Sequence, residues 1–412
     1  MRFPLDASGN PFPFMGDAAW SLIAQLSRED AVTYLTDRAS RGFNAVQVSL
    51  LEHKFSTSPP ANAYGDQPFT TANDFSTPNE AYFAHAEYVI QQAAARNILV
   101  LLTPAYIGTG GGDEGWYQAI EANGPTKMRT YGQYVANRFK ALANIMWVEA
   151  GDWNPPDRSG VQAIGNGIRD ITPGALQTAH CEEGTSALAY WSSEAWLSIN
   201  TVYTRSTIYN AMATEYQRSQ QMPVFFIEGT YENENYGAGI PTEQGLRKEA
   251  FHGLLSGGFG HVFGNNPIWH FDGPGLFSAP YDWKTAMGAR GSVSMTYVRN
   301  VLTRAGWGAL VPDLSNAFLT SGLSSGEDRA VASVTASKSA GVAYLPSVRS
   351  VNVNLGALAG PRVNLSWYDP SAGAYAAIDA SPVANTGIRS LTPPANNAAG
   401  FHDWVLLAES VS

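Results

Sequence analysis

The sequence is poor in cysteine, with Cys181 as the one cysteine among 412 residues. A single cysteine cannot form an intramolecular disulfide, so the fold does not depend on oxidation. No Cys/His group has the spacing of a zinc site, and no Gly-x-Ser-x-Gly elbow of a serine hydrolase is present. We therefore expect neither a metal nor another cofactor.

Long hydrophobic runs and basic clusters are also missing. No stretch approaches the ~18 to 20 apolar residues that span a membrane, and residues 1–10 lack the apolar region of a signal peptide. The protein is therefore expected to be cytoplasmic, or else the mature form of an exported protein. The net charge of −10 and the pI near 5.2 disfavour nucleic acid and anionic membranes as partners. The oligomeric state stays open.

Apolar, β-prone runs alternate with helical stretches up to about residue 305, a pattern typical of βα repeats. The first run ends near Asp17, and the others span 43–50, 98–103, 145–148, 176–179, 199–203, 224–227 and 260–263. Helices are expected at 28–41, 79–96, 125–141, 164–171, 208–220 and 243–255. Because the runs are almost continuously apolar, both faces of the sheet should be buried. We predict a (β/α)8 TIM barrel over residues 1–307. A doubly wound open sheet is the alternative, although no Gly-rich phosphate loop follows the first strand.

The pattern changes after Trp307. Short alternating strands follow, separated by turn residues, at 330–335, 341–345, 351–355, 363–368, 375–379 and 404–408. This spacing predicts a small antiparallel β-sandwich domain over residues 308–412. The strands suggest no aromatic groove, so a role in bracing the barrel is favoured for this domain.

An acidic residue follows or ends an apolar run and lies at the start of a loop in two segments, 144–156 and 223–232. Parallel barrels carry their catalytic groups at the C-terminal ends of the strands. The fourth and seventh strands lie on opposite sides of such a barrel, so Asp152 and Glu228 should face each other. Glycoside hydrolysis needs two carboxyl groups, one to protonate the leaving oxygen and one on the other side of the sugar ring. We predict Asp152 as general acid/base and Glu228 as nucleophile.

Glu149 and Glu232 are the rival acids. Alternation along a strand could turn Glu149 toward the helices, and Glu228 is held more rigidly by its strand than Glu232. A metal site built from residues 180–183 is disfavoured because adjacent residues diverge, and a nucleophilic role for Cys181 is disfavoured as well.

Further polar and aromatic residues cluster at the same strand ends and suit a carbohydrate site. Each alone could be a rim or loop residue without a role, but their concentration on one face favours function. The candidates for substrate binding are Asp17, Trp20, Gln47, His53, Tyr106, Trp116, Asn154, His180, Tyr203, Tyr231, Asn265 and Trp269. Glu52, Glu182, Glu183 and Arg205 fall on the same rim.

Five segments, at 14–20, 41–47, 79–83, 144–155 and 257–269, make the chain resemble the apiosidase-like glycoside hydrolase family. Members are barrels with a C-terminal domain that is sometimes labelled as collagen-binding. The resemblance implies a retaining hydrolase whose acid/base matches Asp152 and whose nucleophile matches Glu228. Ala150 stands where the family usually has glycine.

The sequence therefore predicts a retaining glycosidase acting on plant-derived glycans or glycosides, with β-apiosides as the best named substrate. Apiose is an analogy, since the loops around a barrel mouth vary freely. The alternatives are another specificity, such as arabinofuranosidase, or a carbohydrate-binding protein without turnover.

Overall fold

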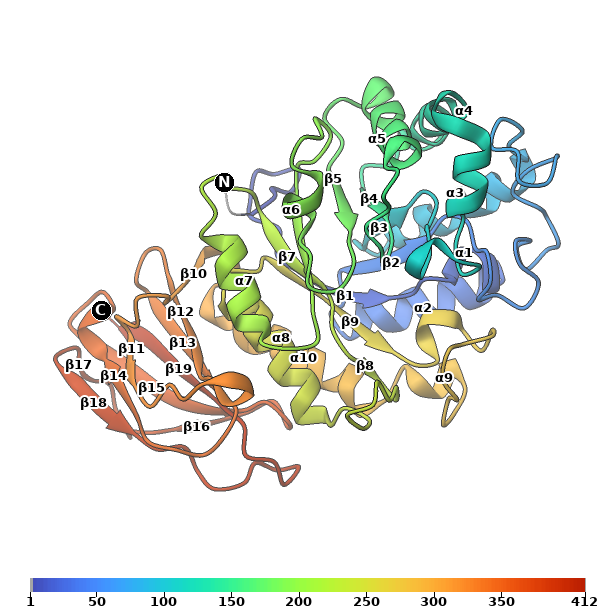
Figure 1. Ribbon diagram of the computed structural model, residues 1–412. Helices are drawn as coiled ribbons and strands as arrows, with labels where there is room; N and C mark the ends of the chain where they lie inside the picture. The colour runs from blue at the N-terminus through green and yellow to red at the C-terminus, as the bar shows by residue number, and fades with distance from the viewer. Residues whose placement is uncertain (1–2, 412) are drawn as a thin grey trace.

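The computed structural model describes residues 3–411 and shows a barrel joined to a β-sandwich (Figure 1). The barrel strands are β1 (Phe14–Ala18), β2 (Ala45–Ser49), β3 (Leu99–Thr103), β4 (Ile145–Ala150), β5 (Gln177–His180), β6 (Asn200–Tyr203), β7 (Val224–Glu228) and β9 (Gly260–Asn265). They pair in parallel in the order β5-β4-β3-β2-β1-β9-β7-β6. The backbone N–H groups of Ser198 and Ile199 donate to the carbonyl of Gln177, which brings β6 back beside β5. The barrel is thus nearly closed, and the predicted fold class is confirmed.

Helices follow the strands and form the outer layer: α2 (Arg28–Ser40), α3 (Glu80–Ala94), α4 (Tyr117–Phe139), α5 (Ser159–Ile171), α6 (Ala187–Trp191), α7 (Ile208–Tyr216), α8 (Glu243–Leu255) and α10 (Arg290–Ala305). The predicted helix start at Pro125 describes only the second part of α4, because Gly124 interrupts that helix with φ 72°. Helix α10 lies where no helix was predicted. Two shorter helices, α1 (Leu22–Gln25) and α9 (Trp283–Ala286), lie in loops.

Alternate residues of the barrel strands point to opposite layers. Leu101, Met146 and Phe225 pack together inside the barrel, whereas Val100 and Trp147 pack against the helices. Both layers are apolar, which explains why the strands are continuously hydrophobic. A one-residue step along a strand therefore decides whether a polar side chain faces the barrel mouth or the helices.

Two antiparallel sheets form the C-terminal sandwich. The larger contains β10 (Leu310–Pro312), β12 (Val331–Thr335), β13 (Ala340–Leu345), β19 (Trp404–Val411), β15 (Arg362–Asp369), β16 (Ala374–Ala377) and β17 (Val383–Ala384). The smaller contains β11 (Leu319–Ser321), β14 (Val351–Asn354) and β18 (Ile388–Leu391). Val353 and Leu391 of the smaller sheet share one core with Leu345, Leu365 and Leu406 of the larger. The antiparallel region follows the barrel as predicted, with extra short strands.

The sandwich packs against α8 and α10, which lie between it and the barrel strands in Figure 1. One hydrophobic cluster contains Leu246 and Leu254 of α8, Val298 of α10, and Val342 and Val405 of the sandwich. A buried contact of this kind holds the two parts in a fixed relation.

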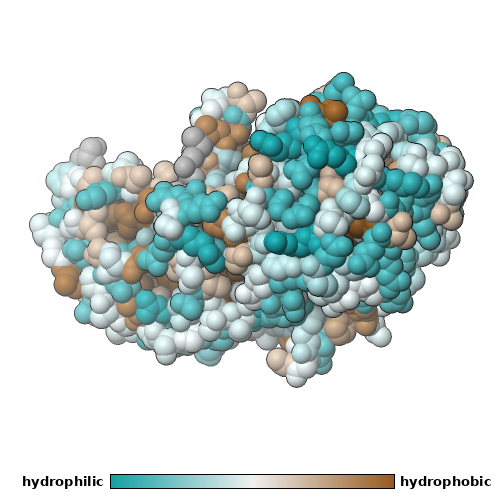
Figure 2. Space-filling model, turned by 45° about the horizontal axis from the view of Figure 1, so that its top comes forward, coloured by the Kyte–Doolittle hydropathy of each residue, from teal (hydrophilic) through white to brown (hydrophobic). Residues whose placement is uncertain are grey.

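Hydrophilic residues cover most of the face in Figure 2, and the hydrophobic residues visible there form separate groups. Within residues 3–411, no helix combines the length and hydropathy that crossing a membrane requires.

Candidate active site

Asp152 reaches the barrel mouth through a turn in the left-handed region of φ. Ala150 ends β4 with φ 67°, and Gly151 and Asp152 follow with φ 139° and 56°. Gly151 is needed here, because a Cβ atom at this position would lie 2.2 Å from the ring of Tyr106. Residues other than glycine pay about 1 kcal/mol or more for such backbone angles. The strain turns the chain sharply, so that the carboxyl group of Asp152 enters the mouth.

Glu228 is the last residue of β7 and is 6% exposed. The loop behind it is fixed by Glu249 of α8, whose carboxyl oxygens accept the backbone N–H of Thr230 at 2.9 Å and its hydroxyl at 2.6 Å. Gly229 passes so close that a Cβ atom would lie 2.3 Å from Oε2 of Glu249. Strand, glycine and helix together leave the Glu228 side chain little freedom.

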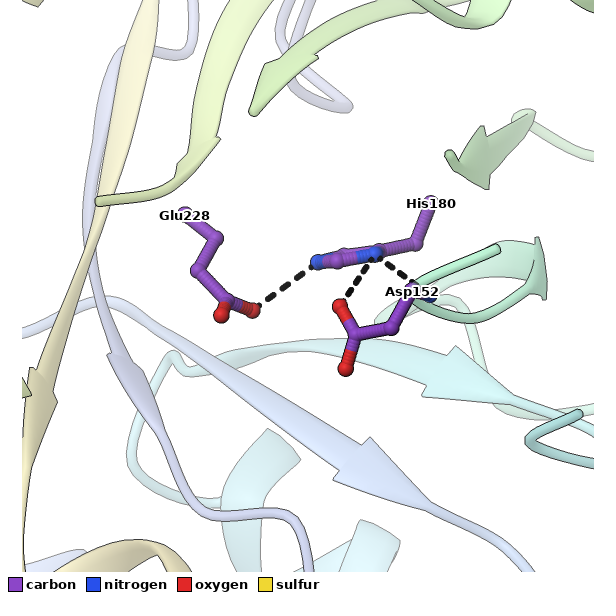
Figure 3. A group of neighbouring side chains, drawn as sticks. All are labelled: Asp152, His180 and Glu228. Carbon is purple, nitrogen blue, oxygen red and sulfur yellow. Dashed lines mark hydrogen bonds and ion pairs between the residues drawn. The ribbon is translucent and has the colours of Figure 1, made fainter. Parts of the chain in front are cut away.

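His180, the last residue of β5, bridges the two acids (Figure 3). Its Nε2 atom lies 3.0 Å from Oε2 of Glu228. Its Nδ1 atom accepts the backbone N–H of Asp152 at 3.0 Å and lies 3.1 Å from Oδ1 of the same residue. Since Nδ1 receives a proton donor, the ring proton belongs on Nε2, from which it is donated to Glu228.

The surroundings shift the pKa values of Glu228 and His180. Burial, followed by the charge of Asp152, raises the pKa of Glu228 to about 7, while His180 and Arg205 act in the opposite direction. Burial alone would lower the pKa of His180, but the carboxylates of Asp152 and Glu228 outweigh it and raise that pKa. A cluster of this kind titrates as a unit, so its protons belong to the group rather than to single residues.

Two further side chains touch the acids. The hydroxyl of Tyr106, in the loop after β3, donates to Oδ2 of Asp152 at 2.6 Å. Burial, then the charge of Asp152, holds the pKa of Tyr106 well above its usual range, so it stays a donor. Arg205, after β6, brings a guanidinium nitrogen to 4.0 Å from Oε1 of Glu228.

The acids line a cavity of about 280 Å³ at the C-terminal ends of the strands. Its walls come from Trp20, Ser49, Glu52, Phe55, Tyr106, Thr109, Glu114, Asp152, Glu182, Glu183, Tyr203, Arg205, Glu228, Tyr231, Glu234, Tyr236, Trp269 and Leu276. Seven of these residues are acidic and one is basic. The cavity is therefore acidic and rich in aromatic rings, which suits an uncharged polyhydroxylated ligand better than an anion.

The indole rings in the cavity are held by their edges. The Nε1 group of Trp20 donates to the hydroxyl of Tyr231 at 3.0 Å, and that of Trp269 donates to Oε1 of Glu234 at 2.7 Å. Phe55 packs edge-on against Trp269, with ring centres 4.9 Å apart. These contacts fix the rings as rigid apolar walls.

Six of the predicted binding residues thus gather with the two acids: Trp20, Tyr106, His180, Tyr203, Tyr231 and Trp269. His180 lies behind the carboxyl groups and is fully buried, so it contacts the acids rather than the open cavity.

Four predicted residues lie away from the cavity. Asp17 faces the helices, where it is fully buried and forms an ion pair with Arg38 of α2 at 3.1 Å. Gln47 points into the barrel below the mouth and is fully buried. Trp116 belongs to the core beneath the helices, and Asn265 donates to Glu232 at 2.8 Å. Strand parity explains the correction for Asp17, depth below the mouth explains it for Gln47, and core packing does so for Trp116.

Two more predicted residues support loops instead of lining the cavity. Asn154 donates to the hydroxyl of Thr185 at 3.1 Å and so ties the loop after β4 to the loop after β5. His53 contacts the backbone carbonyl of Asp113 at 2.9 Å and packs edge-on against Trp116. Both residues therefore stabilise loops at the rim of the cavity without lining it.

Glu149 and Glu232, the alternative candidates for the two catalytic acids, lie outside the cavity. Glu149 is fully buried among the helices, with both carboxyl oxygens unpartnered within the described chain, and burial holds its pKa well above the usual range. Glu232 accepts the backbone N–H of Gly291 at 2.8 Å, at the start of α10. Cys181 is buried, which raises its pKa to about 12 and makes it a poor nucleophile.

Sequence reasoning missed the part of the cavity that comes from long loops. Glu234 and Tyr236 follow β8 (Tyr231–Glu232), and Leu276 lies in the loop before α9. Such segments have no periodic pattern, and only the cluster of acidic and aromatic residues at 231–236 could have drawn attention.

The carboxyl groups of Asp152 and Glu228, with His180, could also hold a metal ion, since one ligand atom of each lies within 4.8 Å of the others. Both ring nitrogens of His180 are already engaged by these two residues. An ion would have to break the bond between His180 and Glu228, so the geometry fits proton sharing better.

The eight-stranded barrel, with paired acids across a cavity at its C-terminal face, defines a glycoside hydrolase. The family model described as "Apiosidase-like, catalytic domain" matches residues 1–308, and the chain belongs to this family. A second model, described as "Putative collagen-binding domain of a collagenase", matches residues 311–409.

Solved structures have the same fold. A glycoside hydrolase family 5 protein from Bacteroides vulgatus ATCC 8482 superimposes with a TM-score of 0.86 at 23% identity, over 99% of this chain and 92% of that one. Another structure, described as a glycoside hydrolase, gives 0.85 at 22% identity, over 99% and 95%. No curated protein matches the sequence.

Proposed function

We propose that the protein is a retaining glycosidase that cleaves β-apiosides in plant-derived glycans or glycosides, with Asp152 as acid/base and Glu228 as nucleophile. One observation carries the mechanism: an oxygen of Asp152 and an oxygen of Glu228 lie within 4.8 Å of each other. Retaining enzymes separate their carboxyl groups by ~5 to 5.5 Å, while inverting enzymes need ~6.5 to 9.5 Å for an intervening water.

The reaction has two steps. In the first, Asp152 gives its proton to the glycosidic oxygen as the bond from that oxygen to C1 breaks, and Glu228 bonds to C1. In the second, water attacks C1 and passes its proton to Asp152, and the bond between C1 and Glu228 breaks to restore the carboxylate. The second step needs Asp152 as the carboxylate, because Glu228 is then esterified. The first step needs the opposite state, with the proton on Asp152 and the charge on Glu228.

The surroundings support this distribution of charge. Glu228 has a donor from His180 and the guanidinium of Arg205 nearby. Oδ1 of Asp152 instead faces Nδ1 of His180, a nitrogen that already accepts a hydrogen bond. No donor in the described chain therefore reaches Oδ1 of Asp152, whereas Oε2 of Glu228 accepts from His180. The pKa of Glu228 near 7 includes the charge of Asp152, and this contribution vanishes when Asp152 is protonated.

Apiose is proposed as the sugar because of the family to which the chain belongs. The acidic cavity adds that the sugar bound there is uncharged, since a uronate would meet seven acidic side chains and one arginine. The small volume, about 280 Å³, suits one or two sugar units at the point of cleavage.

The test is hydrolysis of aryl glycosides of apiose, arabinofuranose, galactose, glucose and rhamnose by the wild type, Asp152→Asn and Glu228→Gln. We expect turnover of the apioside, loss of at least about 10³-fold in Glu228→Gln, and retention of anomeric configuration by NMR. Asp152→Asn should keep more activity on a dinitrophenyl glycoside, whose leaving group needs no proton, than on a phenyl glycoside.

Thermal unfolding of each variant serves as the control for folding. If the enzyme prefers the arabinofuranoside, the proposed substrate is wrong but the proposed mechanism still holds. Binding of every glycoside without turnover would point to a carbohydrate-binding protein. Inversion of the anomeric configuration would contradict the role of Glu228 as nucleophile.

A further inference from the structure

Arg205 is the one basic residue among those that line the cavity. Its guanidinium is held in place from three sides. One terminal nitrogen pairs with Oε2 of Glu183 at 2.6 Å, the other donates to the hydroxyl of Tyr203, and the plane lies 4.2 Å from the ring centre of Tyr236. The side chain is 26% exposed, so its charge is only partly screened.

The two carboxyl oxygens of Glu228 differ in their surroundings. Oε2 is bound by Nε2 of His180 at 3.0 Å. Oε1 has no hydrogen-bond donor within residues 3–411, and a terminal nitrogen of Arg205 lies 4.0 Å from it. The oxygen without a donor is the one free to bond to C1, so the guanidinium faces the attacking atom.

We propose that Arg205 is a positioning residue that acts through Glu228, its charge stabilising the carboxylate on Oε1 before attack and again as the glycosyl–enzyme bond breaks. This inference rests on the proposed function. In the second step the electron pair of the bond between C1 and Oε1 returns to Oε1, beside the guanidinium. Stabilising this charge makes the carboxylate a better leaving group.

Other charged or titratable groups around Glu228 must be considered for any effect of pH. They are Tyr106 after β3, Asp152 after β4, His180 on β5, Tyr203 on β6, Tyr231 on β8 and Tyr236 in the following loop. The tyrosine pKa values are all raised by burial, so these side chains stay neutral. Asp152 opposes the negative charge on Glu228, and His180 and Arg205 favour it. Arg205, unlike these groups, stays cationic at every pH at which the activity would be measured.

Arg205→Gln removes the charge, Arg205→Lys keeps it, and Arg158→Gln is the matched control. Arg158 also stacks on aromatic rings, at 5.1 Å from Tyr190 and 5.6 Å from Trp191, but outside the cavity. The measurement is kcat/KM against pH on the best aryl glycoside, together with the rate at which its 2-deoxy-2-fluoro analogue labels Glu228.

For Arg205→Gln we expect the acid limb of the profile to move up by about 1 pH unit, because an opposite charge at this distance lowers a carboxyl pKa by that amount or more. Labelling at pH 6 should slow about tenfold. Arg205→Lys should restore most of the shift, and millimolar guanidinium should partly rescue Arg205→Gln. Arg158→Gln should match the wild type.

A profile for Arg205→Gln that falls equally at every pH, without rescue by lysine or guanidinium, would overturn the inference and leave Arg205 with a structural role. If the wild type itself is not labelled at Glu228, the proposed function fails instead. If the wild type is labelled at Glu228 and Arg205→Gln has the same labelling rate and pH profile, only the proposed role of Arg205 is wrong.

Discussion

Arg247 of α8 and Asp403, next to the first residue of β19, form a doubly bonded ion pair in which both side chains are fully buried. Nε and one terminal nitrogen of Arg247 each lie 2.8 Å from an oxygen of Asp403. Asn397 and Tyr344 add donors to the same carboxylate, at 2.8 and 3.2 Å. The sandwich is thus bound to the helix that also fixes the loop behind Glu228.

Replacing Asp403 with asparagine should destabilise the whole chain, because the buried guanidinium of Arg247 would lose its counter-charge. Breaking one partner of a buried pair costs about 3 to 5 kcal/mol. Urea unfolding would measure this. The matched control is Arg304→Gln, which breaks the exposed pair with Glu409 and should cost no more than about 1 kcal/mol. Equal losses in both variants would contradict a bracing role for the sandwich.

Replacing His180 with alanine should lower kcat rather than raise KM, since the imidazole contacts the two acids and lies behind the cavity. A hydrogen bond to a charged group is worth about 1.5 to 3 kcal/mol, so a loss of about 10- to 150-fold is expected. His180→Gln keeps a donor and should recover part of this loss. Steady-state kinetics on the best aryl glycoside would show it. A raised KM with unchanged kcat would return His180 to the role of a substrate-binding residue.

Replacing Gly151 with alanine should disrupt the site, because the added methyl group would meet the ring of Tyr106 at 2.2 Å. Tyr106 or the loop must shift, and a displacement of about 1 Å can cost about 100-fold in rate. Ala150→Gly, one residue earlier at φ 67°, is the control and should keep full activity with stability within about 1 kcal/mol of the wild type. Full activity of Gly151→Ala would show that the turn tolerates a side chain.

The position of the two acids proposed as the catalytic pair could be predicted from the sequence, whereas the orientation of other polar residues could not. Apolar runs fix where strands lie, and Asp152 and Glu228 stand at or just beyond their ends, so both reach the mouth. Asp17 also stands near a strand end, but it lies one residue before Ala18, which faces the barrel interior. Its pairing with Arg38 depends on a helix whose rotation about its axis no local pattern specifies.

Replacing Asp17 with asparagine tests this correction. The change should reduce stability by about 3 kcal/mol, because Arg38 loses a fully buried counter-charge, and it should leave KM unchanged. Urea unfolding and steady-state kinetics on one preparation would separate the two effects. Asp37→Asn is a useful comparison, since Asp37 contacts the same arginine but is 21% exposed, and its loss should be smaller. A higher KM at unchanged stability would restore Asp17 to the binding site.

Glu249 predicts a pH dependence of stability. Burial raises its pKa from 4.5 to about 7, against the opposing hydrogen bonds from Thr230. Between these two pH values the folded chain binds this proton and the unfolded chain does not, so the free energy of unfolding must fall as pH rises through the window. Above pH 7 both states have lost the proton and the contribution is constant. The total change is about 3 kcal/mol.

Glu249→Gln should flatten this part of the profile, because glutamine does not titrate. The absolute stability will change as well, since an amide cannot accept both the backbone N–H and the hydroxyl of Thr230 in the same way. The slope between pH 4.5 and 7 is therefore the quantity to compare, by urea unfolding at several pH values. Parallel profiles for the wild type and Glu249→Gln would show that Glu249 is already ionised in the folded chain at low pH.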